Sequence, residues 1–425
     1  MRLFNLLLLI CLLISCASNE QIPDSESVSK PFVTAQKEYR VSIRVQLPDG
    51  VTGPVYLTGN VDALGPWNPN GLLMSGQGKI RTAEIQLPQD FHFEYKFTLG
   101  SWEREAVGPS GMVMPNRKMK VDANRQVRIE IVDFKKDPLA YIEDWQGSGV
   151  LGTLVYWKDV PSAHLAHTRH VSIWLPPEYQ AHPQQRYRVI YMSDGQNLFD
   201  PRIANTGVDW GVDEAMMKLV AEGVEPAIVV GVWNSSSRGM EYSPWHDAPR
   251  YAQFLTEELL PRVNADFRTR TGPQNTAHIG SSMGGLLSFY LVTQQSQYFG
   301  SCGCMSTHFP LSESIVAQYF ADATTPATPN SKPYVLRDIE AGMRAPSTAR
   351  MWFDYGTVGL DAEYGPSHAQ VRQWLLAQGF VEQRDFVVRA YQGAEHSEAA
   401  WRARLQDPLR FLLAAPAKLG SGAGQ

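Results

Sequence analysis

From about residue 169 to residue 415, the chain alternates short strand-like runs with longer helix-like runs, and this alternation constrains the fold more than any other feature. Strands are predicted at residues 170–175, 187–193, 227–233, 276–280, 299–305, 350–356 and 385–391. Helices are predicted at residues 211–222, 250–264, 283–295 and 367–378. Because strands separated by helices pair in parallel, the sequence predicts an α/β domain over 169–415, with a mostly parallel sheet covered by helices on both faces.

The residues before this domain have another period. Over residues 39–134, alternating segments such as Tyr39–Val45 and Phe91–Phe97 are punctuated by Gly, Pro and Asn, without a helical period between them. Alternation with a period of two is typical of strands that have one buried face. We therefore expect an all-β sandwich over 39–134, followed by a linker over 135–168.

The first sixteen residues have the layout of a secretory signal. Met1-Arg2 supplies a positive start, and the apolar run Leu3–Leu13 is too short to span a bilayer stably. The run ends in Leu13-Ile14-Ser15-Cys16, which resembles a bacterial lipobox and implies that Cys16 is lipidated and becomes the mature N-terminus. Ala17 fits the pattern associated with outer-membrane sorting. We therefore expect an exported, outer-membrane lipoprotein, with a soluble exported protein cleaved nearby as the alternative.

Composition and charge narrow the class of protein. The chain has 425 residues, a formal net charge of −5 and no long basic run, so we expect no nucleic-acid partner and no membrane contact beyond the lipid anchor. Residues 17–38 are polar and are predicted to form a tether, and residues 416–425 a disordered tail. The signal peptide over 1–16 and the tether thus precede the sandwich, the linker and the α/β domain.

Cysteines and histidines give little reason to expect a metal. The mature chain keeps Cys302 and Cys304, and their C-x-C spacing on a strand predicts buried thiols rather than a bridge or a metal site. Three histidines recur at every third residue next to a strand, where that period does not gather side chains on one face. They are His164, His167 and His170. We expect neither a metal nor a cofactor.

The motif Gly280-Ser281-Ser282-Met283-Gly284 carries the strongest chemical signal. It follows the apolar strand Thr276–Ile279 and opens the helix at 283–295, which is the strand–turn–helix context of a nucleophile elbow. Glycines in the motif allow the tight, strained turn that exposes the serine hydroxyl. Ser282 is therefore the predicted nucleophile, and a Gly/Ser turn without chemistry is the alternative.

A serine nucleophile needs a general base, and three histidines follow Ser282 in the sequence. His396 lies just past the last predicted strand, at the carboxyl edge of the sheet, and is the predicted base. His368 opens a helix, where we expect a solvated or capping residue. His308 follows a strand end, so it could line the pocket, although a structural role is the alternative.

The acid that orients the base should stand between the serine and the histidine in the chain. Asp361 lies on the loop beyond strand 350–356 and is the predicted acid. Asp354 is its rival, but its position inside the strand suggests a supporting role. Glu363 and Glu395 are further candidates.

An acyl-transfer site also needs two backbone N–H groups that stabilise the oxyanion. One should be the amide of Met283, directly after the nucleophile. The other should come from the loop Ser193–Asn197, where Gln196 is the predicted donor and Asn197 the alternative.

Several stretches of the α/β region resemble the esterase D-like family of α/β-hydrolases, which includes enterochelin and feruloyl esterases. They are Val171–Tyr179, Asp194–Phe199, Gly280–Gly284, Trp233-Asn234 with Glu241–Pro244, and Gly393–Glu398. The resemblance implies the α/β-hydrolase fold and ester hydrolysis. Asn197, His308, Arg238 and Glu241 are then candidates for substrate contact, with an ion pair that orders the loop as the alternative role for the last two.

The sandwich has a resemblance of its own. Gly59–Pro69, Phe93–Phe97, Trp102-Glu103 and Pro115–Arg117 resemble starch-binding β-sandwich domains. In such domains indole faces stack on sugar rings, and the resemblance implies a glucan site. Its candidate residues are Trp67, Lys96 and Trp102. A non-binding spacer, with Trp67 packed in the core, is the alternative.

Together these features predict a lipid-anchored serine carboxylic-ester hydrolase that acts on acyl or feruloyl esters of carbohydrate. The expected partner is a small-molecule or polysaccharide ester. A siderophore-like lactone esterase and a catalytically silent carbohydrate-binding surface lipoprotein are the alternatives, and acyl transfer in place of hydrolysis is a third.

The lipobox-like sequence predicts that Cys16→Ser releases the protein from the membrane fraction or leaves its precursor unprocessed, because the variant has no thiol to acylate. Membrane fractionation and intact-mass analysis measure this. Cys11→Ser is the matched control, since Cys11 lies inside the apolar run and its loss should leave processing unchanged. An unmodified Cys16 in the mature protein would contradict the prediction.

Overall fold

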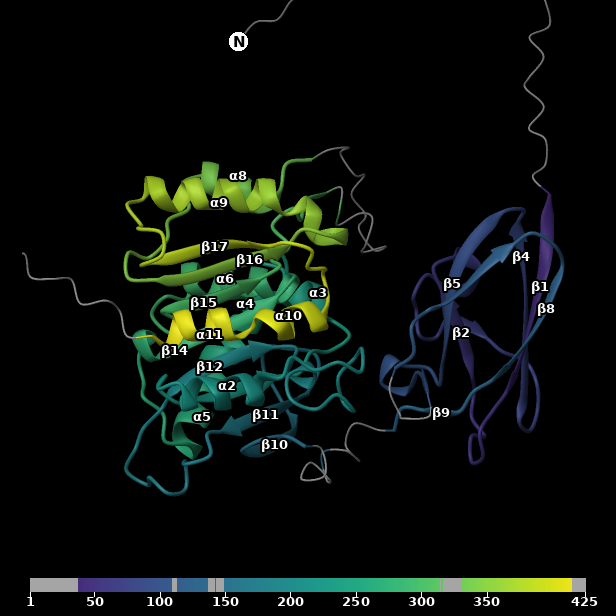
Figure 1. Cartoon of the computed structure of the whole chain (residues 1–425), viewed down its shortest axis with the longest axis horizontal. Coiled ribbons are helices and arrows are strands. Elements are labelled where there is room, and N and C mark those ends of the chain that lie inside the picture. The colour runs from purple at the N-terminus through teal and green to yellow at the C-terminus, as the bar shows by residue number, and fades with distance from the viewer. Residues whose placement is uncertain are drawn as a thin grey trace, which may run out of the picture.

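The computed structural model describes residues 37–108, 113–136, 142, 149–313, 315 and 331–414. Figure 1 shows an N-terminal all-β domain and a C-terminal α/β domain, so the predicted fold class is confirmed. The predicted signal peptide with Cys16, nearly all of the tether and the tail at 416–425 lie outside the described residues. Within the described part of the chain, no helix has the length and apolar character needed to cross a membrane.

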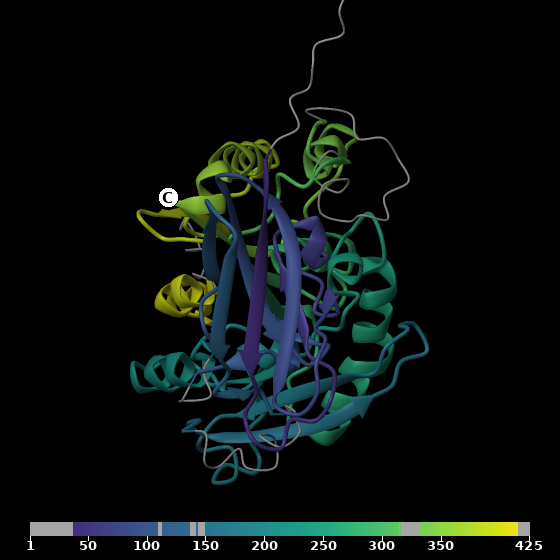
Figure 2. The ribbon, with the colours of Figure 1, turned by 90° about the vertical axis from the view of Figure 1, so that its right-hand side faces the viewer.

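The N-terminal domain is a sandwich of short strands, which lies in front of the α/β domain in Figure 2. One sheet has the order β4-β1-β8 and the other β3-β2-β5-β7, with a small β6-β9 pair beside them. The strands are β1 (Glu38–Gln46), β2 (Tyr56–Gly59), β3 (Leu72–Leu73), β4 (Ile80–Pro88), β5 (Phe91–Thr98), β6 (Ala106–Val107), β7 (Arg117–Val121), β8 (Arg125–Glu130) and β9 (Asp133–Phe134).

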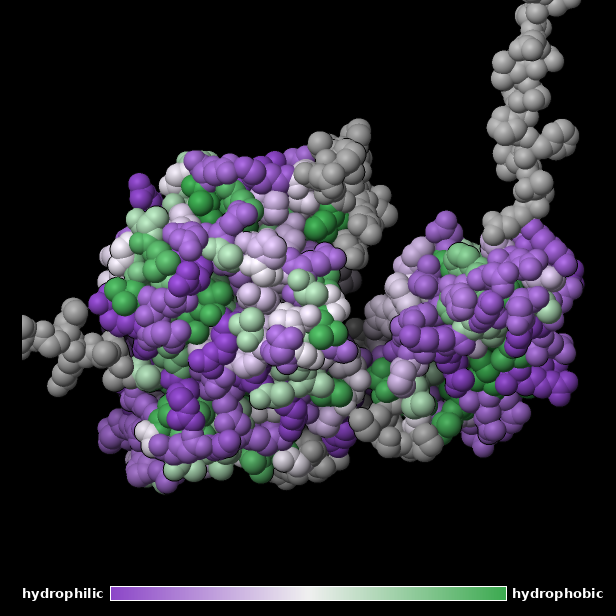
Figure 3. Space-filling model, turned by 45° about the horizontal axis from the view of Figure 1, so that its top comes forward, coloured by the Kyte–Doolittle hydropathy of each residue, from purple (hydrophilic) through white to green (hydrophobic). Residues whose placement is uncertain are grey.

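Alternation along these strands builds the core of the sandwich. Val41, Ile43 and Val45 of β1 are buried, and they pack in one cluster with alternate aromatic residues of β5 such as Phe93 and Phe97. The residues that alternate with the buried ones, such as Arg44, are half-buried or exposed, and the sandwich surface visible in Figure 3 is predominantly hydrophilic. The period-two pattern in the sequence thus corresponds to one buried and one exposed face.

The α/β domain contains a single sheet of eight strands in the order β10-β11-β13-β12-β14-β15-β16-β17. Neighbouring strands from β13 to β17 are parallel, whereas β10 and β11 are added antiparallel at one edge. The strands are β10 (Thr153–Val160), β11 (Arg169–Leu175), β12 (Arg188–Ser193), β13 (Ala227–Val232), β14 (Thr276–Ser281), β15 (Ser301–Met305), β16 (Arg350–Gly356) and β17 (Phe386–Tyr391).

Helices cover both faces of this sheet, and each face has its own buried cluster. One cluster includes residues of α4, α5, α6 and α9, and the other residues of α2 and α11. The longer helices are α2 (Val212–Ala221), α4 (Ala248–Gln253), α5 (Leu260–Asp266), α6 (Met283–Gln294), α8 (Tyr334–Glu340), α9 (Gly365–Ala377), α10 (Glu398–Arg404) and α11 (Gln406–Leu413), with the single turn α3 (Arg238–Glu241).

Two sequence expectations need correction. Strand β10 lies inside the predicted linker 135–168, because the buried residues of this edge strand follow no regular period and a bulge between Trp157 and Val160 interrupts its pairing with β11. The helix expected at 250–264 is a run of α4, a π-helical segment at Phe254–Leu259, and α5. Pro261, near the start of α5, has no amide N–H to donate, which accounts for the irregular turn before it.

A buried lysine at the end of the sandwich connects the two domains. Lys135 is 6% exposed, and its ammonium donates to the carbonyl oxygens of Ala204 and Asn205 at 3.0 and 3.2 Å. The Glu105 carboxylate lies 3.7 Å from the same ammonium. The charge of Lys135 is therefore compensated inside the contact between the domains.

Parallel pairing brings the carboxyl ends of the strands to one edge. Ser281 at the end of β14 is in register with Met305 of β15, and Met305 is in register with Asp354 of β16. Gly356 at the end of β16 pairs with Tyr391 of β17. The loops that carry the predicted nucleophile, acid, base and oxyanion donor all leave this edge.

Candidate active site

The turn between β14 and α6 holds Ser282 in a strained backbone conformation. Ser282 has φ 56° and ψ −120°, and α6 begins at the next residue. A Cβ atom at Gly280 would lie 2.4 Å from the carbonyl oxygen of Gly284, so the turn requires glycine there. A non-glycine residue at positive φ costs about 1–3 kcal/mol, which the surrounding structure must offset. Ser282 is half-buried, in the strand–turn–helix context expected of a nucleophile elbow.

Hydrogen bonds from the neighbouring strand fix the backbone of this serine. The amide of Ser282 donates to the carbonyl of Met305 at 3.0 Å. Its carbonyl in turn accepts from the amide of His308 at 3.2 Å. The loop after β15 therefore lies directly beside Ser282.

His396 and Asp361 are brought together by the loops that follow β17 and β16. Nδ1 of His396 lies 2.6 Å from Oδ1 of Asp361. The Asp361 side chain is fully buried, whereas the His396 side chain is 18% exposed. Oδ2 of Asp361 accepts from the Ser306 hydroxyl at 2.5 Å and from the Gly356 amide at 2.7 Å. Burial alone would raise the pKa of Asp361, but the hydrogen bonds from His396, Ser306 and Gly356 hold that pKa below its ordinary value.

The rival acid Asp354 has different partners. Its Oδ1 accepts from Nε of Arg404 at 2.9 Å, and its Oδ2 from the Trp352 indole at 2.7 Å. Burial raises the pKa of Asp354, although the nearby Arg404 opposes that shift. Glu363 and Glu395 are exposed. Of the carboxylates considered as the acid, Asp361 is therefore the one hydrogen-bonded to the imidazole.

The loop after β12 places the predicted oxyanion donor. Gln196 and Asn197 are buried in a short 3-10 turn, Gly195–Asn197. The Asn197 amide donates to the carbonyl of Asp194 at 2.8 Å, so it is already used within the turn. Among backbone bonds outside regular helices and strands in the described residues, neither Met283 nor Gln196 donates. These two amides are thus the better pair to receive an oxyanion.

Arg238 and Glu241, on the loop after β13, each form an ion pair with a residue of another segment. Arg238 binds both carboxylate oxygens of Asp194 at 2.7 Å, and its side chain keeps 31% of its surface exposed. Glu241 is 2% exposed, and its two oxygens accept from Arg169 at 3.1 Å. Arg238 therefore borders the loop after β12 and stays partly exposed, whereas Glu241 is held in the interior.

His308 lies close to the predicted base. It is 9% exposed, and its Nδ1 is 2.6 Å from the hydroxyl of Tyr364. The Tyr364 ring meets the His396 ring edge-on, with centroids 5.7 Å apart. Burial lowers the pKa of His308 to about 4, and the charge of His396 acts in the same direction. His308 is therefore neutral at pH 7 and offers an uncharged imidazole beside the site.

One residue near the site has different surroundings from those predicted, and three others were not predicted from the sequence. His368 is fully buried, not solvated, and its Nδ1 is 2.9 Å from the carbonyl of Tyr364. Ser306, Trp401 and Arg404 also surround Asp361, and no local pattern marks them. The one sequence feature that could have identified Ser306 as a site residue is its position just after β15, the strand beside the turn that holds Ser282.

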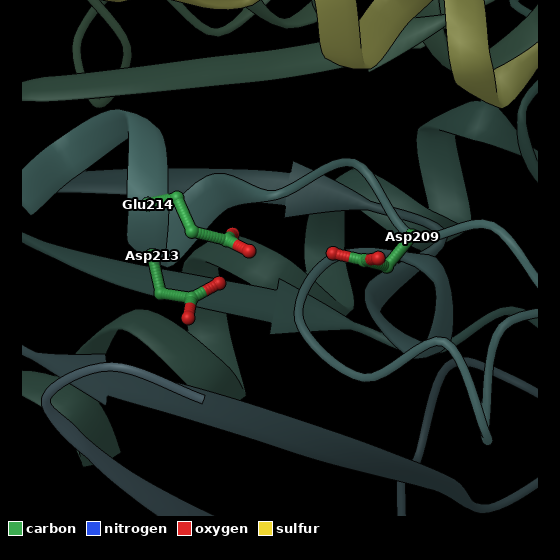
Figure 4. A group of neighbouring side chains, drawn as sticks. All are labelled: Asp209, Asp213 and Glu214. Atoms are coloured by element: carbon green, nitrogen blue, oxygen red, sulfur yellow. The ribbon is translucent and has the colours of Figure 1, made fainter. Parts of the chain in front are cut away.

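Acidic side chains gather near the start of α2, as Figure 4 shows. Asp209, Asp213 and Glu214 could together reach a metal ion. Arg402 already binds Asp209 at 2.6 Å and Glu214 at 2.7 Å. Burial raises the pKa of Asp213 to about 7, and Asp213 and Glu214 interact directly. Arg402 thus compensates the charges of Asp209 and Glu214.

The cysteines and the spaced histidines have structural surroundings. Cys302 and Cys304 are free and buried, with sulfur atoms 3.4 Å apart, as the C-x-C spacing predicted. His164 faces Glu257 at 3.1 Å, whereas Nδ1 of His170 accepts from the Asp159 amide at 3.0 Å. These two histidines therefore have separate partners.

In the sandwich, two indoles form a small aromatic platform. The rings of Trp67 and Trp102 have centroids 6.4 Å apart with a 44° tilt, and both residues are half-buried. Trp67 is not among the buried core residues of the sandwich, so the core-filling alternative does not hold. The Lys96 ammonium binds Glu105 at 2.7 Å, so this lysine is already engaged.

Comparison with known proteins gives matches to both regions of the chain. A family model described as Putative esterase matches residues 162–412, and a starch binding domain model matches residues 39–130. The uncharacterized protein YbbA of Bacillus subtilis (strain 168) is 24% identical over 240 residues, which are 52% of this chain and 83% of YbbA. An endo-1,4-beta-xylanase/feruloyl esterase of Xylanibacter ruminicola is 26% identical over 202 residues, which are 43% of this chain and 25% of that protein.

Similar solved structures include two named as esterases. A ferulic acid esterase has a TM-score of 0.47 and 20% identity, and the match covers 62% of this chain and 98% of that one. The enterobactin esterase from Shigella flexneri has a TM-score of 0.47 and 14% identity, and the match covers 88% of this chain and 93% of that one.

Proposed function

Since the chain belongs to the Putative esterase family and is a carboxylic-ester hydrolase, we propose that it works through Ser282, His396 and Asp361. We further propose that its substrate is an acyl or feruloyl ester of a carbohydrate. The observation that carries the first proposal is the 2.6 Å contact between His396 and Asp361, on loops that leave the same sheet edge as Ser282.

The proposed reaction follows from the roles that these side chains can take. With its Nδ1 proton hydrogen-bonded to Asp361, His396 keeps Nε2 free to accept the proton of the Ser282 hydroxyl. The serine oxygen attacks the ester carbonyl, and the amides of Met283 and Gln196 stabilise the oxyanion. His396 then returns the proton to the leaving alcohol, and an acyl-enzyme on Ser282 forms. Water repeats the sequence with His396 as base, which releases the acid and restores the serine.

Two findings support a carbohydrate ester as the substrate. Residues 39–130 match the starch binding domain model, and Trp67 and Trp102 present an aromatic platform in that region. The xylanase/feruloyl esterase relative carries the name of an enzyme on feruloyl esters. A panel of acetylated, feruloylated and lactone substrates distinguishes this proposal from a lactone esterase, and assays with an added alcohol acceptor distinguish hydrolysis from acyl transfer.

For the location, we propose export and lipid attachment at Cys16. The support is the short apolar run that ends in Leu13-Ile14-Ser15-Cys16. A lipid anchor would hold the enzyme at a membrane surface, while the polar residues 17–38 separate it from the lipid.

Ser282→Ala should abolish turnover of p-nitrophenyl acetate, with a loss in kcat of about 10⁴- to 10⁶-fold, because the members of a triad act as a unit.

Asp361→Asn should lower kcat by up to about 10⁴-fold, because an amide no longer favours the working tautomer of His396. Steady-state kinetics at pH 7 to 8 measure both changes.

Ser288→Ala is the matched control for these variants. Ser288 lies on α6, the helix that follows Ser282, and is fully buried, but its hydroxyl donates to the carbonyl of Gly284 and lies 2.7 Å from Nδ1 of His278. This variant should keep kcat within a few-fold of the wild-type value. If Ser282→Ala retained more than about a hundredth of wild-type kcat, Ser282 would not be the nucleophile.

Replacing Trp67 and Trp102 by alanine should weaken binding to amylose or glycogen by at least about tenfold, or about 1.4 kcal/mol, because the indole faces are the proposed sugar platform. Affinity electrophoresis of the full-length Ser282→Ala protein measures the binding. Phe91→Ala is the control, since Phe91 is exposed on β5 and stands about 17 Å along the strand from Lys96. If the folded Ser282→Ala protein with both tryptophans intact showed no retardation on these gels, the sandwich would be a spacer that does not bind glucan.

A further inference from the structure

The hydrogen bonds around Asp361 continue inward, away from His396, through Ser306. Ser306 is fully buried on the loop after β15, at φ 38°. Its hydroxyl oxygen accepts from Nη2 of Arg404 at 2.6 Å and from the Trp401 indole at 3.0 Å. A hydroxyl has two acceptor sites and one proton. With both acceptor sites filled by groups that can only donate, the Ser306 proton must point to Asp361 Oδ2, at 2.5 Å.

Arg404 is itself fixed by the second buried carboxylate. Its side chain is 2% exposed, and it binds Asp354, whose side chain is fully buried. Asp354 also accepts from the Trp352 indole at 2.7 Å and from the Ser306 amide at 3.3 Å. A buried guanidinium is stable only when it is paired, so Asp354 determines where Arg404 lies.

These bonds fix the direction of the Asp361 carboxylate. Oδ2 is held by the Ser306 hydroxyl and the Gly356 amide, and Nη2 of Arg404 is 3.8 Å away. Rotation of the carboxylate would break both hydrogen bonds at once. Oδ1 therefore stays directed at Nδ1 of His396.

We propose that Arg404 is a positioning residue, which Asp354 anchors and which directs the Ser306 hydroxyl at Asp361 and thereby holds Asp361 on His396. Its effect on turnover rests on the proposed function, whereas its effect on the contact between Asp361 and His396 does not. Helix α10 supports this role, because Trp401 also packs edge-on against the His396 ring with centroids 5.1 Å apart.

The pH profile provides a readout that a merely structural role would not move. Ser306→Ala removes a donor that holds Asp361 in place without changing any charge, so the carboxylate can turn away from the imidazolium. The imidazolium then loses part of its stabilisation, and the acidic limb of kcat/KM should move to lower pH. The other charged or titratable groups packed around the pair are Arg404, Asp354, His308, Tyr364 and His368.

Three variants of the full-length protein test the proposal. Ser306→Ala removes the hydroxyl, and Ser306→Gly removes it while also relieving the positive φ. The double variant Asp354→Asn/Arg404→Met removes both charges, so that no buried charge is left without a partner. Each should lower kcat about 10- to 100-fold on p-nitrophenyl acetate, with KM within about twofold, as expected when a hydrogen bond to a charged group is lost from the reacting arrangement.

Thr256→Val is the matched control. Thr256 is 7% exposed, and its hydroxyl donates to the carbonyl of Ala252, within the helical segment before α5. This variant loses a buried hydroxyl without touching Asp361 and should keep kcat and the pH profile. Circular dichroism and thermal unfolding establish that each variant is folded before its kinetics are compared.

A second readout does not depend on turnover. The proton between His396 Nδ1 and Asp361 should give a low-field ¹H NMR signal in protein with ¹⁵N-labelled histidine, assigned by its loss in His396→Ala. In Ser306→Ala and in the double variant this signal should broaden or move upfield, whereas Thr256→Val should leave it unchanged. Ser306→Gly also removes the hydroxyl but relieves the positive φ, so it replaces Ser306→Ala in this comparison where the alanine variant does not fold. It should give the same NMR result.

The outcomes separate the two proposals. If wild-type protein failed to turn over esters, or if Ser282→Ala kept its turnover, the proposed function would be wrong, and the NMR comparison would still decide the role of Arg404. If the variants kept kcat within about twofold, or left the low-field signal unchanged, the positioning role would be overturned.

Discussion

Parallel pairing of strands β12 to β17 is the constraint on which the site depends, because it brings the ends of all these strands to one edge of the sheet. Side chains that are 98 residues apart in the sequence, those of Ser306 and Arg404, then come within hydrogen-bonding distance. The pairing is stabilised by strands such as Ala227–Val232, in which every residue is buried. The rigid sheet allows loops with unfavourable backbone conformations to persist at this edge.

Four of the seven non-glycine residues that have positive φ in the described part of the chain lie at the candidate sites. Asp194, Ser282 and Ser306 have φ angles of 57°, 56° and 38°, and they follow β12, β14 and β15. Trp67, on the aromatic platform of the sandwich, has φ 47°. Each such residue costs about 1–3 kcal/mol unless its surroundings compensate, and strain of this kind concentrates where a side chain must be held for function. Glucan binding by the sandwich, as proposed, would raise the effective concentration of ester substrate near the α/β domain.

The sequence allowed the architecture and the principal side chains to be predicted, because these depend on local patterns and chain order. Alternating strands and helices gave the parallel sheet, and the order of serine, acid and histidine led to Asp361, which contacts His396 at 2.6 Å. Strand β10 was missed because its buried residues follow no regular period. The roles of Ser306 and Arg404 could not be predicted, because they arise from hydrogen bonds between loops that the sequence does not connect. His368 was misread for the same reason, since its burial depends on the packing of α9.

The central claim is that Ser282 is an activated nucleophile, and covalent labelling tests it most directly. A fluorophosphonate reacts with a serine hydroxyl whose proton a neighbouring base removes, and it remains attached to the oxygen. Intact-mass and peptide analysis of the full-length protein should show one phosphonyl group per chain, on the peptide that contains Ser282, and no labelling of Ser282→Ala. A wild-type protein that stays unlabelled, or one labelled at a different residue, would contradict the account.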